Sequence, residues 1–542
     1  MRSRLIPILF TLGTALATAV FAADSQQPAA QYTKPSGDTR LADAAENGDF
    51  AGVVTLLKAK VPANQTQPDG STALLWAARS GSLEMVRALL AAGAQVNAAN
   101  RYGLTPLMEA CREDNAAIAE ALLAAGADPS LAQSEGETPL MAASAVGNLR
   151  IVQKLISMGV DVNAKEKVQD QNALMWAADA GHADVVQALL NAKANPNAIA
   201  RPSSLQRVGS LDGGRMWVDH SSGGLSTLMF AARQGSLESV RELVKAGADM
   251  KYANPDKITA LMIAVVNDHL DLAAELLKLG ADPNDGSLYE AVQIHNLRMN
   301  STAGDATRPR PIHENSLTPS DLIGRFLDAG ADPLKPAEHT LHSDGTGTPR
   351  PVDQSAMTLV LNTHDVEVLR VLLAKGLSAN KPLENGNPPL VAALTAGGGG
   401  FFGFGVTPAA YRYPGSHSID ETLKLLVDSG ADVKGVSTAT GDTALHAAAQ
   451  SGNLNAIRFL AERGASLTAQ NKFGFTPLDI AMGKRPPNSD RRRGGNGGFP
   501  PRRDGPQPEA IKLLRELMGL PAEAAPSASS ASANPLPPAG NN

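Results

Sequence analysis

The sequence predicts an all-α fold, an α-solenoid of about twelve stacked helix-turn-helix-hairpin units. Two observations predict it. Leu74, Leu107 and Leu140 are spaced 33 residues apart, and "STALLWAARSG" (Ser71–Gly81) returns as "QNALMWAADAG" (Gln171–Gly181). Each copy is followed by a second apolar segment such as "VRALLAAGAQVN". A fixed period in the thirties is typical of repeats that bury their apolar faces on one another.

The first helix of each unit is predicted to follow a turn. In the second unit, Asp69-Gly70 supplies that turn, because glycine tolerates positive φ and aspartate bonds nearby backbone. Thr72 is placed as the helix N-cap. Small side chains such as Ala77 let a neighbouring helix approach closely, and Gly81 ends the helix.

The second helix of that unit is predicted from Leu83 to about Ala91. Met85, Val86 and Leu89 fall on one face at helical spacing. The glycine of the following "AAGA" stops the helix as a left-handed cap. Both helices therefore have an apolar side to bury in the stack.

This unit resembles an ankyrin repeat. The family pattern, D-G-x-T-P-L-H-x-A-A followed by L-L-x-x-G-A-D-V-N, is met closely over Asp69–Asn97, Gly136–Asn163, Gly224–Asp249 and Gly441–Ala465. The family's histidine is replaced by leucine or methionine in most units and appears only at His446. The resemblance covers most of residues 38–519 and implies an ankyrin repeat protein that binds a protein partner. The N-terminal segment described below indicates the bacterial, exported kind.

The units vary in regularity along the chain. They are expected to begin near Asp38, Asp69, Tyr102, Glu135, Asp170, Gly223, Asp256, Ser287, Thr340, Leu383, Thr440 and Lys472. The first lacks the full signature and is expected to be the N-terminal cap. The pattern is weakest between residues 287 and 437.

Five insertions interrupt the predicted solenoid. Residues near 199–223 and 336–354 lie on the hairpin side of their units. Residues near 297–318, 396–418 and 483–507 fall between the first and second helices. The regular array is therefore concentrated in the N-terminal half.

The N-terminus predicts export. Residues 1–22 combine two arginines, an apolar run and a small residue at Ala22, which is typical of a signal peptide. An uncleaved membrane anchor is the alternative, but the run is short for a spanning helix. Residues 23–37 are a polar linker, and 520–542 form a Pro/Ala/Ser-rich tail expected to be disordered. We expect a periplasmic or secreted protein without stable membrane insertion.

Composition argues against several function classes. The formal net charge of −6 does not suggest nucleic-acid binding. Cys111 is the only cysteine, so no intramolecular disulfide or cysteine-based metal site can form, and its position predicts a buried, inert thiol. We found no Gly-x-Ser-x-Gly, His-Glu-x-x-His or phosphate-loop motif. The sequence therefore predicts no catalytic residue, metal or cofactor, and no enzyme.

The predicted function is protein binding by a monomeric scaffold. Partner contacts are expected near the end of each first helix, on the concave face, where side chains vary while the frame holds. These positions are Arg79, Ser80, Arg112, Glu113, Asp179, Arg233, Gln234 and Asn267. They predict a polar groove of mixed charge.

Two other function classes stay open at this point. A binder of cell-wall glycan or a small ligand would need an aromatic platform. Trp76, Trp176 and Phe230 share one slot, two residues after the signature leucine, although this slot is expected to pack in the core. A hydrolase site inside the inserted loops is the third alternative.

The insertion at 199–223 is a predicted β-hairpin around "DGG", a strong turn signal. A three-residue loop would pair Val208 with Val218, whereas a two-residue loop would pair Val208 with Trp217. Trp217 beside Arg215 is either an interface anchor or a plug that folds back onto the stack.

Overall fold

The computed structural model describes residues 37–202, 208–209, 217–218, 223–300, 315–340, 350–395, 418–484 and 506–521. The predicted signal peptide lies outside the described residues, as do nearly all of the predicted linker and tail. The chain forms two compact units, residues 1–161 and 162–542.

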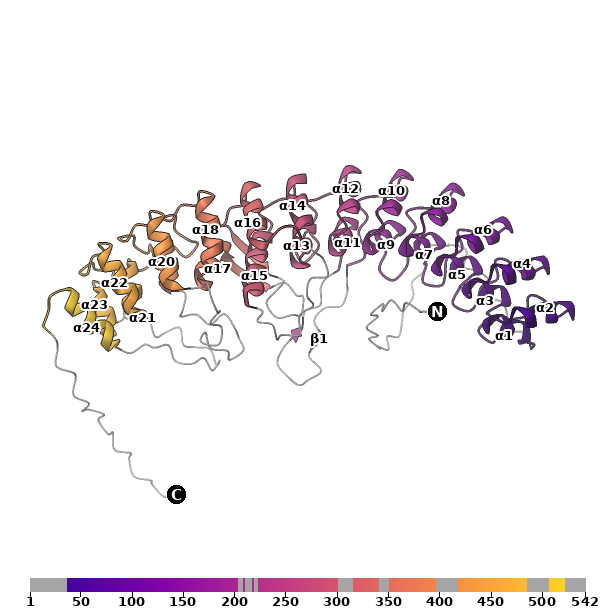
Figure 1. Ribbon diagram of the computed structural model, residues 1–542, viewed down its shortest axis with the longest axis horizontal. Helices are drawn as coiled ribbons and strands as arrows, with labels where there is room; N and C mark the ends of the chain where they lie inside the picture. The colour runs from indigo at the N-terminus through magenta and orange to yellow at the C-terminus, as the bar shows by residue number, and fades with distance from the viewer. Residues whose placement is uncertain are drawn as a thin grey trace, which may run out of the picture. The chain divides into compact units, whose positions relative to one another are not determined.

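Paired helices dominate both units. Unit 1 contains α1 (Arg40–Glu46), α2 (Phe50–Lys58), α3 (Ala73–Arg79), α4 (Leu83–Ala91), α5 (Pro106–Arg112), α6 (Ala116–Ala124), α7 (Pro139–Val146) and α8 (Leu149–Ser157). Within unit 1, Figure 1 shows the odd-numbered helices in one row and the even-numbered helices in another. Odd helices pack on odd helices and even on even, as in a stack of helix hairpins.

Unit 2 continues the pairs from α9 onward. Its first helices are α9 (Ala173–Ala180), α11 (Thr227–Gln234), α13 (Ala260–Val266), α15 (Ser287–Asn300), α17 (Ala356–Thr363), α19 (Pro389–Thr395), α21 (Ala444–Ser451) and α23 (Pro477–Ala481). Its second helices are α10 (Ala183–Asn191), α12 (Leu237–Lys245), α14 (Leu270–Leu279), α16 (Pro319–Asp328), α18 (Val366–Ala374), α20 (Ile419–Asp428), α22 (Leu454–Glu462) and α24 (Pro508–Leu517). The predicted α-solenoid class is confirmed.

Local chemistry sets the helix ends. Thr72 Oγ1 accepts a hydrogen bond from the backbone N of Leu75 at 3.2 Å, which satisfies an otherwise unpaired donor at the start of α3. Gly81 and Gly93 have φ angles of 75° and 81°, the left-handed region that glycine adopts without strain. These predicted caps are confirmed.

The core of a regular pair is aliphatic and small. In α3 and α4, Leu74, Ala77, Val86 and Leu89 are fully buried. Leucine fills the space between the two helices, and alanine lets the next first helix approach. Burying a leucine or valine side chain stabilises the fold by about 1.5–3 kcal/mol. Because much of this burial occurs against the adjacent pairs, each pair is stabilised mainly by its neighbours.

An asparagine ladder joins successive hairpins. Asn64 Nδ2 donates to Gly93 O at 3.2 Å, and Asn64 Oδ1 accepts from Gln95 N at 2.6 Å. The same two bonds start from Asn97, Asn163, Asn197, Asn284 and Asn380. One amide side chain thus satisfies a carbonyl and an N–H of the following turn.

The ladder asparagine is replaced at five equivalent positions of the described residues, Ser130, Lys251, Leu334, Lys434 and Thr468. The serine side chain is short and donates to Asp128 within its own turn instead. Lysine lacks an acceptor and leucine lacks both groups. At these junctions, neighbouring repeats are held by helix packing without the asparagine bridge.

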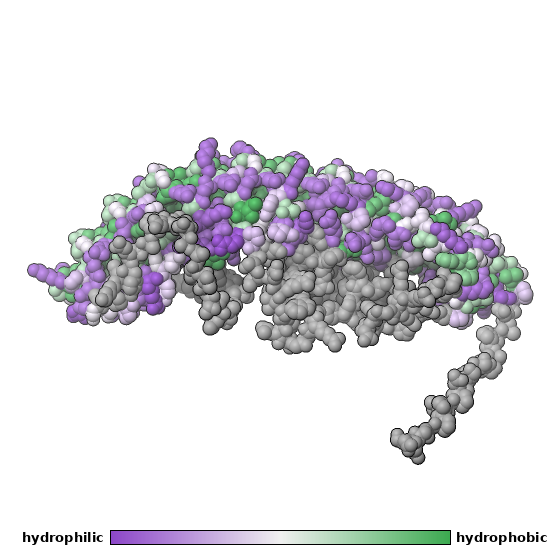
Figure 2. All heavy atoms as spheres, turned by 180° about the vertical axis from the view of Figure 1, so that it is seen from behind, coloured by the Kyte–Doolittle hydropathy of each residue, from purple (hydrophilic) through white to green (hydrophobic). Residues whose placement is uncertain are grey.

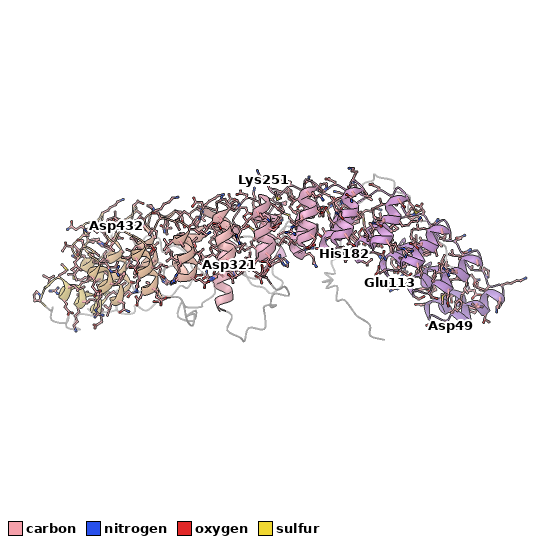
Figure 3. All side chains as sticks on the ribbon, turned by 45° about the horizontal axis from the view of Figure 1, so that its top comes forward. Asp49, Glu113, His182, Lys251, Asp321 and Asp432 are labelled. Carbon is pink, nitrogen blue, oxygen red and sulfur yellow. The ribbon has the colours of Figure 1, made fainter. Side chains whose placement is uncertain are left out.

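In unit 2 the hairpins and the helix–helix connections lie on opposite edges. Figure 3 shows Lys251 and Asp432, both in hairpin turns, along one edge. His182 and Asp321, at the starts of second helices, lie along the other. Residues 301–314, 396–417 and 485–505 belong to the helix–helix connections and lie outside the described residues.

The hairpin after α10 has the register expected for a three-residue loop. Strands β1 (Val208–Gly209) and β2 (Trp217–Val218) are antiparallel, with Val208 opposite Val218 and Gly209 opposite Trp217. Closer to the helices, isolated bridges join Ile199 to Ser226 and Pro202 to Gly223. Arg215 lies outside the described residues, and only the backbone of Trp217 is described.

A second sheet occupies the insertion before α17, where the sequence predicts an insertion but no strands. Strands β3 (Pro336–Thr340) and β4 (Arg350–Ser355) pair antiparallel, with a register shift between Ala337 and His339. Ala337 and Val352 pack with Tyr289 of α15. The strands are therefore supported by an apolar cluster that they form with Tyr289. Sequence periodicity did not reveal this cluster.

Candidate functional site

The predicted contact positions lie at the C-terminal ends of first helices. Ser80, Glu113 and Asn267 each follow a helix directly, and the others are within α3, α5, α9 and α11. Arg79, Ser80, Glu113, Arg233, Gln234 and Asn267 are exposed, whereas Arg112 and Asp179 are half-buried. These side chains differ in whether their polar groups are already bonded to other residues of the protein.

Arg112 is held within unit 1. Its Nε donates to Glu137 Oε1 at 3.0 Å, its Nη2 pairs with the other oxygen, and Nη2 also reaches Gln133 Oε1 at 3.3 Å. Burial acts to lower the pKa of Arg112, but Glu137 outweighs it and raises the pKa. This bidentate pair ties α5 to the hairpin before α7, so Arg112 is mainly structural.

Arg233 is held in the same way within unit 2. Its guanidinium lies 5.0 Å from the ring centroid of Phe230 and donates to Asp179 Oδ1 at 2.5 and 3.2 Å. The fold therefore brings two predicted contact residues together and pairs them with each other. Phe230 is only 4% exposed, which places it in the core.

Arg79 shares the position of Arg233 within its repeat but has no acid partner. Its guanidinium carbon lies 5.4 Å from the ring centroid of Trp76, and Arg79 forms no hydrogen bond or ion pair with any described residue. The Trp76 indole N–H donates to Gln67 Oε1 at 2.8 Å. Gln67 Nε2 in turn donates to Asp43 and Glu46 of α1, at 2.9 and 2.6 Å.

Sequence reasoning missed Glu109, which occupies the Trp76 slot one repeat further on. It is 3% exposed. Burial raises the pKa of its carboxyl group, while the charges of Arg112 and Arg79 act to lower it. A signal existed, because Glu109 is an acidic residue in a slot that holds Trp76 in the preceding repeat and Ala142 in the following one.

Cys111 is a buried thiol in α5. Burial raises its pKa to about 12, so the thiolate that acts as a nucleophile or metal ligand is not formed at neutral pH. The predicted inert core thiol is confirmed. Within the described residues, no group of three or more His, Cys, Asp or Glu side chains is placed to hold a metal ion.

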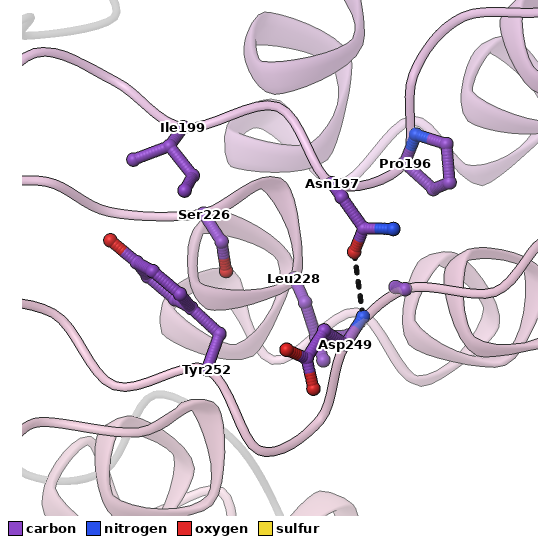
Figure 4. Close-up of a pocket in the computed structure, with 8 residues that line it drawn as sticks. Pro196, Asn197, Ile199, Ser226, Leu228, Asp249 and Tyr252 are labelled. Carbon is purple, nitrogen blue, oxygen red and sulfur yellow. Dashed lines mark hydrogen bonds between the residues drawn. The ribbon is translucent and has the colours of Figure 1, made fainter.

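A cavity of about 200 Å³ lies on the hairpin side of unit 2, at the base of the β1–β2 hairpin (Figure 4). It is lined by Pro196, Asn197, Ile199, Ser226, Leu228, Ala248, Asp249 and Tyr252. Asn197 Oδ1 accepts from Asp249 N at 2.7 Å, and Tyr252 OH donates to Gly224 O at 2.8 Å. Small-ligand pockets usually enclose about 300–1,000 Å³ and present convergent polar groups, so this cavity does not favour a small-ligand site.

The face shown in Figure 2 is largely hydrophilic, with hydrophobic areas interspersed among polar ones. Ion pairs also join neighbouring repeats, including Arg150–Glu120 in unit 1 and Arg241–Glu275 in unit 2. Within the part of the chain that the structure describes, no helix is both long and apolar enough to cross a membrane.

Comparison with curated proteins finds relatives of larger size. The chain is 25% identical over 259 residues to a putative palmitoyltransferase ZDHHC13 of Danio rerio, covering 46% of this chain and 32% of that protein. It is 35% identical over 267 residues to the palmitoyltransferase ZDHHC17 of Homo sapiens, covering 47% and 33%. It is 34% identical over 129 residues to the mitochondrial disaggregase of Bos taurus, covering 20% and 19%. The chain spans about a third of the length of the palmitoyltransferases that it matches.

Among solved structures, the human ASB11 ankyrin repeat domain matches at 25% identity, with a TM-score of 0.33, over 41% of this chain and 90% of that one. The family model of ankyrin repeats (3 copies) matches residues 41–133, 118–200, 210–287 and 409–488. These matches together cover more than half of the 542 residues. With its paired helices, capped turns and hairpin ladder, the chain belongs to the ankyrin repeat family.

Proposed function

We propose that the protein is a non-enzymatic scaffold that binds a protein partner through the first-helix ends and hairpins. One observation carries the proposal. Exposed side chains that differ from repeat to repeat stand at one position of a constant frame, namely Ser80, Glu113, Gln234 and Asn267. Such a row supplies side-chain diversity at fixed spacing, which suits recognition of an extended protein surface.

The alternative of a glycan or small-ligand binder receives less support. An aromatic platform would need exposed rings, but Phe230 is in the core and Trp76 is half-buried beneath Arg79. The cavity of about 200 Å³ has its main polar groups bonded to the protein itself.

Palmitoyl transfer is not proposed for this chain. The likeness to the palmitoyltransferases covers about a third of their length.

We propose that the scaffold acts in the periplasm or outside the cell as a monomer, with cleavage after Ala22. The charged start and apolar run of residues 1–22 support export. The intact mass of protein recovered from the envelope fraction of the native host tests cleavage. A mass that retains residues 1–22 would contradict it.

The binding proposal is tested with two matched triple variants. Glu113→Arg, Gln234→Arg and Asn267→Arg change exposed first-helix ends, whereas Glu84→Arg, Gln153→Arg and Gln187→Arg change exposed second-helix positions. A partner captured from the native host by the wild-type chain is purified, and its Kd for each variant is measured. We expect the first variant to bind at least about tenfold more weakly and the second to bind like wild type. Equal affinities for all three proteins would rule out this face.

A further inference from the structure

Four arginines among the described residues lie over aromatic rings: Arg79, Arg101, Arg233 and Arg463. Arg233 is paired with Asp179, Arg463 with Asp428, and Arg101 donates to the hydroxyl of its own aromatic partner, Tyr102. Arg79 alone of the four makes no hydrogen bond or ion pair with the described residues. Its guanidinium donors are therefore available to a ligand.

We propose that Arg79 binds the carboxylate of an aspartate or glutamate side chain on the protein partner. The inference rests on the proposed function and names the chemistry that this part of the surface recognises. A guanidinium presents paired N–H donors that match the two oxygens of a carboxylate.

The position of Arg79 is prepared by a chain of contacts. The Trp76 ring beneath it is fixed by the bond from the indole N–H to Gln67, which is anchored on Asp43 and Glu46. A guanidinium stacked on a fixed ring loses less side-chain entropy when it binds a carboxylate than a free side chain would. The same stacking geometry recurs at Arg233, where an acid of the protein already occupies the donors.

The acids of neighbouring repeats are engaged elsewhere or buried. Glu46 accepts from Gln67, Glu137 holds Arg112, and Glu109 is almost fully buried with no ion pair to Arg79. Glu46 and Asp179 occupy the same position within their repeats. Glu46 is in the repeat before Arg79, and Asp179 is in the repeat before Arg233. The acid that would complete the pair is thus diverted by Gln67, which leaves the charge of Arg79 to be complemented from outside.

The test uses peptides of defined sequence. Random linear peptides are selected by display on the full chain, and the enriched sequences are synthesised with amidated C-termini. The Kd of each peptide is measured by titration for wild type, Arg79→Gln and Arg79→Lys, with Arg233→Gln as the matched control. Each Asp or Glu of a peptide is also replaced by Asn or Gln.

We expect one acidic residue whose replacement weakens binding to wild type about tenfold, with no further loss for Arg79→Gln. Arg79→Lys should retain part of the affinity, because it keeps the charge but not the paired donors. Arg233→Gln should leave the dependence on that acid intact.

Three results would overturn the inference. Peptides that bind wild type and Arg79→Gln with equal affinity would overturn the role of Arg79 but leave the proposed function standing. Enriched peptides that fail to bind once their C-termini are amidated would replace the side-chain carboxylate by a terminal carboxylate. A wild-type chain that enriches no peptide and captures no protein would remove the proposed function and the inference together.

Discussion

The regular pair α3–α4 and the region from α15 to α18 reach the same stacked geometry by different contacts. The α3–α4 pair buries aliphatic and small side chains such as Leu74 and Ala77. Helix α15 is twice as long as α3, with 14 residues against 7, and buries Glu290 and His295 completely or nearly so. Both regions bury apolar side chains, and the second also encloses polar partners inside the stack.

The polar contact in the second region is specific. His295 Nδ1 lies 2.7 Å from Asp365 Oδ2, and both side chains are almost fully buried. The other oxygen of Asp365 accepts from Val368 N at 3.0 Å and caps α18. His295 Nε2 lies 3.5 Å from Glu367, which also accepts from Ser320 Oγ of α16 at 2.5 Å.

The difference teaches that an ankyrin-type stack can enclose a polar contact within its apolar core. A buried ion pair adds little net stability over apolar packing, but loss of one partner leaves the other buried and unpaired. We therefore expect the polar region to be the more sensitive to single substitutions.

Asp365→Ala should produce the largest effect, because it removes both the cap of α18 and the partner of His295. We expect a loss of about 3–5 kcal/mol in the free energy of unfolding. Asp49→Ala is the matched control, since Asp49 caps α2 by accepting from Gly52 N at 2.8 Å without any histidine partner, and should cost about 1 kcal/mol. Urea titration with local hydrogen exchange measures both. Equal losses would show that the cap alone accounts for the role of Asp365.

Leu89→Ala tests the apolar region. Leu89 is fully buried in α4, and its truncation should cost about 2–5 kcal/mol. Arg79→Ala, on the exposed end of α3, should change stability by less than about 0.5 kcal/mol. Urea unfolding of the two variants is the measurement. Comparable destabilisation by both would mean that the repeat register of this pair is wrong.

A smaller effect should follow pH. Burial acts to lower the pKa of His295, but Asp365 and Glu367 outweigh it and raise the pKa above its ordinary value of 6.5. Because the folded state binds the proton more tightly, the stabilisation is complete below about pH 6.5 and is lost as pH rises through the folded pKa. Hydrogen exchange of α15 and α18, corrected for the intrinsic rate, should therefore quicken as the pH rises above about 6.5.

Unit 1 is the internal control for this experiment, because residues 1–161 contain no histidine. Its corrected exchange rates should stay nearly constant over the same range. His295→Gln should abolish the pH dependence in α15 and α18. Greater protection at higher pH would contradict the assignment of the proton to this pair.

The sequence predicted the fold where its signals were local. Three signals act within one repeat: the period of 33 residues, a threonine cap such as Thr72 and a glycine such as Gly93. They could therefore be recognised without knowledge of the spatial neighbours. The β1–β2 hairpin was also legible from its turn, although two registers remained open until the backbone pairing placed Val208 opposite Val218. The β3–β4 sheet was not, because its support from Tyr289 comes from a distant helix.

The sequence predicted where the candidate surface lies, but not which of its side chains are already paired within the protein. The sequence located the exposed ends of first helices, because helical spacing and the repeat define that position. It could not distinguish Arg79 from Arg233, since their repeats read alike, with an aromatic residue three positions earlier in each. Only the spatial neighbours decide that Asp179 takes up the donors of Arg233 while Gln67 draws Glu46 away from Arg79.

By itself the sequence determined the repeating unit, its caps and the aliphatic core, because these follow from chain stiffness, hydrogen-bond geometry and hydrophobic periodicity within a few dozen residues. The tertiary structure decided which polar groups meet across repeats. Asp365 lies 70 residues beyond His295, and Asp179 lies 54 residues before Arg233. Such pairings depend on distances of a few ångströms between side chains, which no one-dimensional pattern encodes.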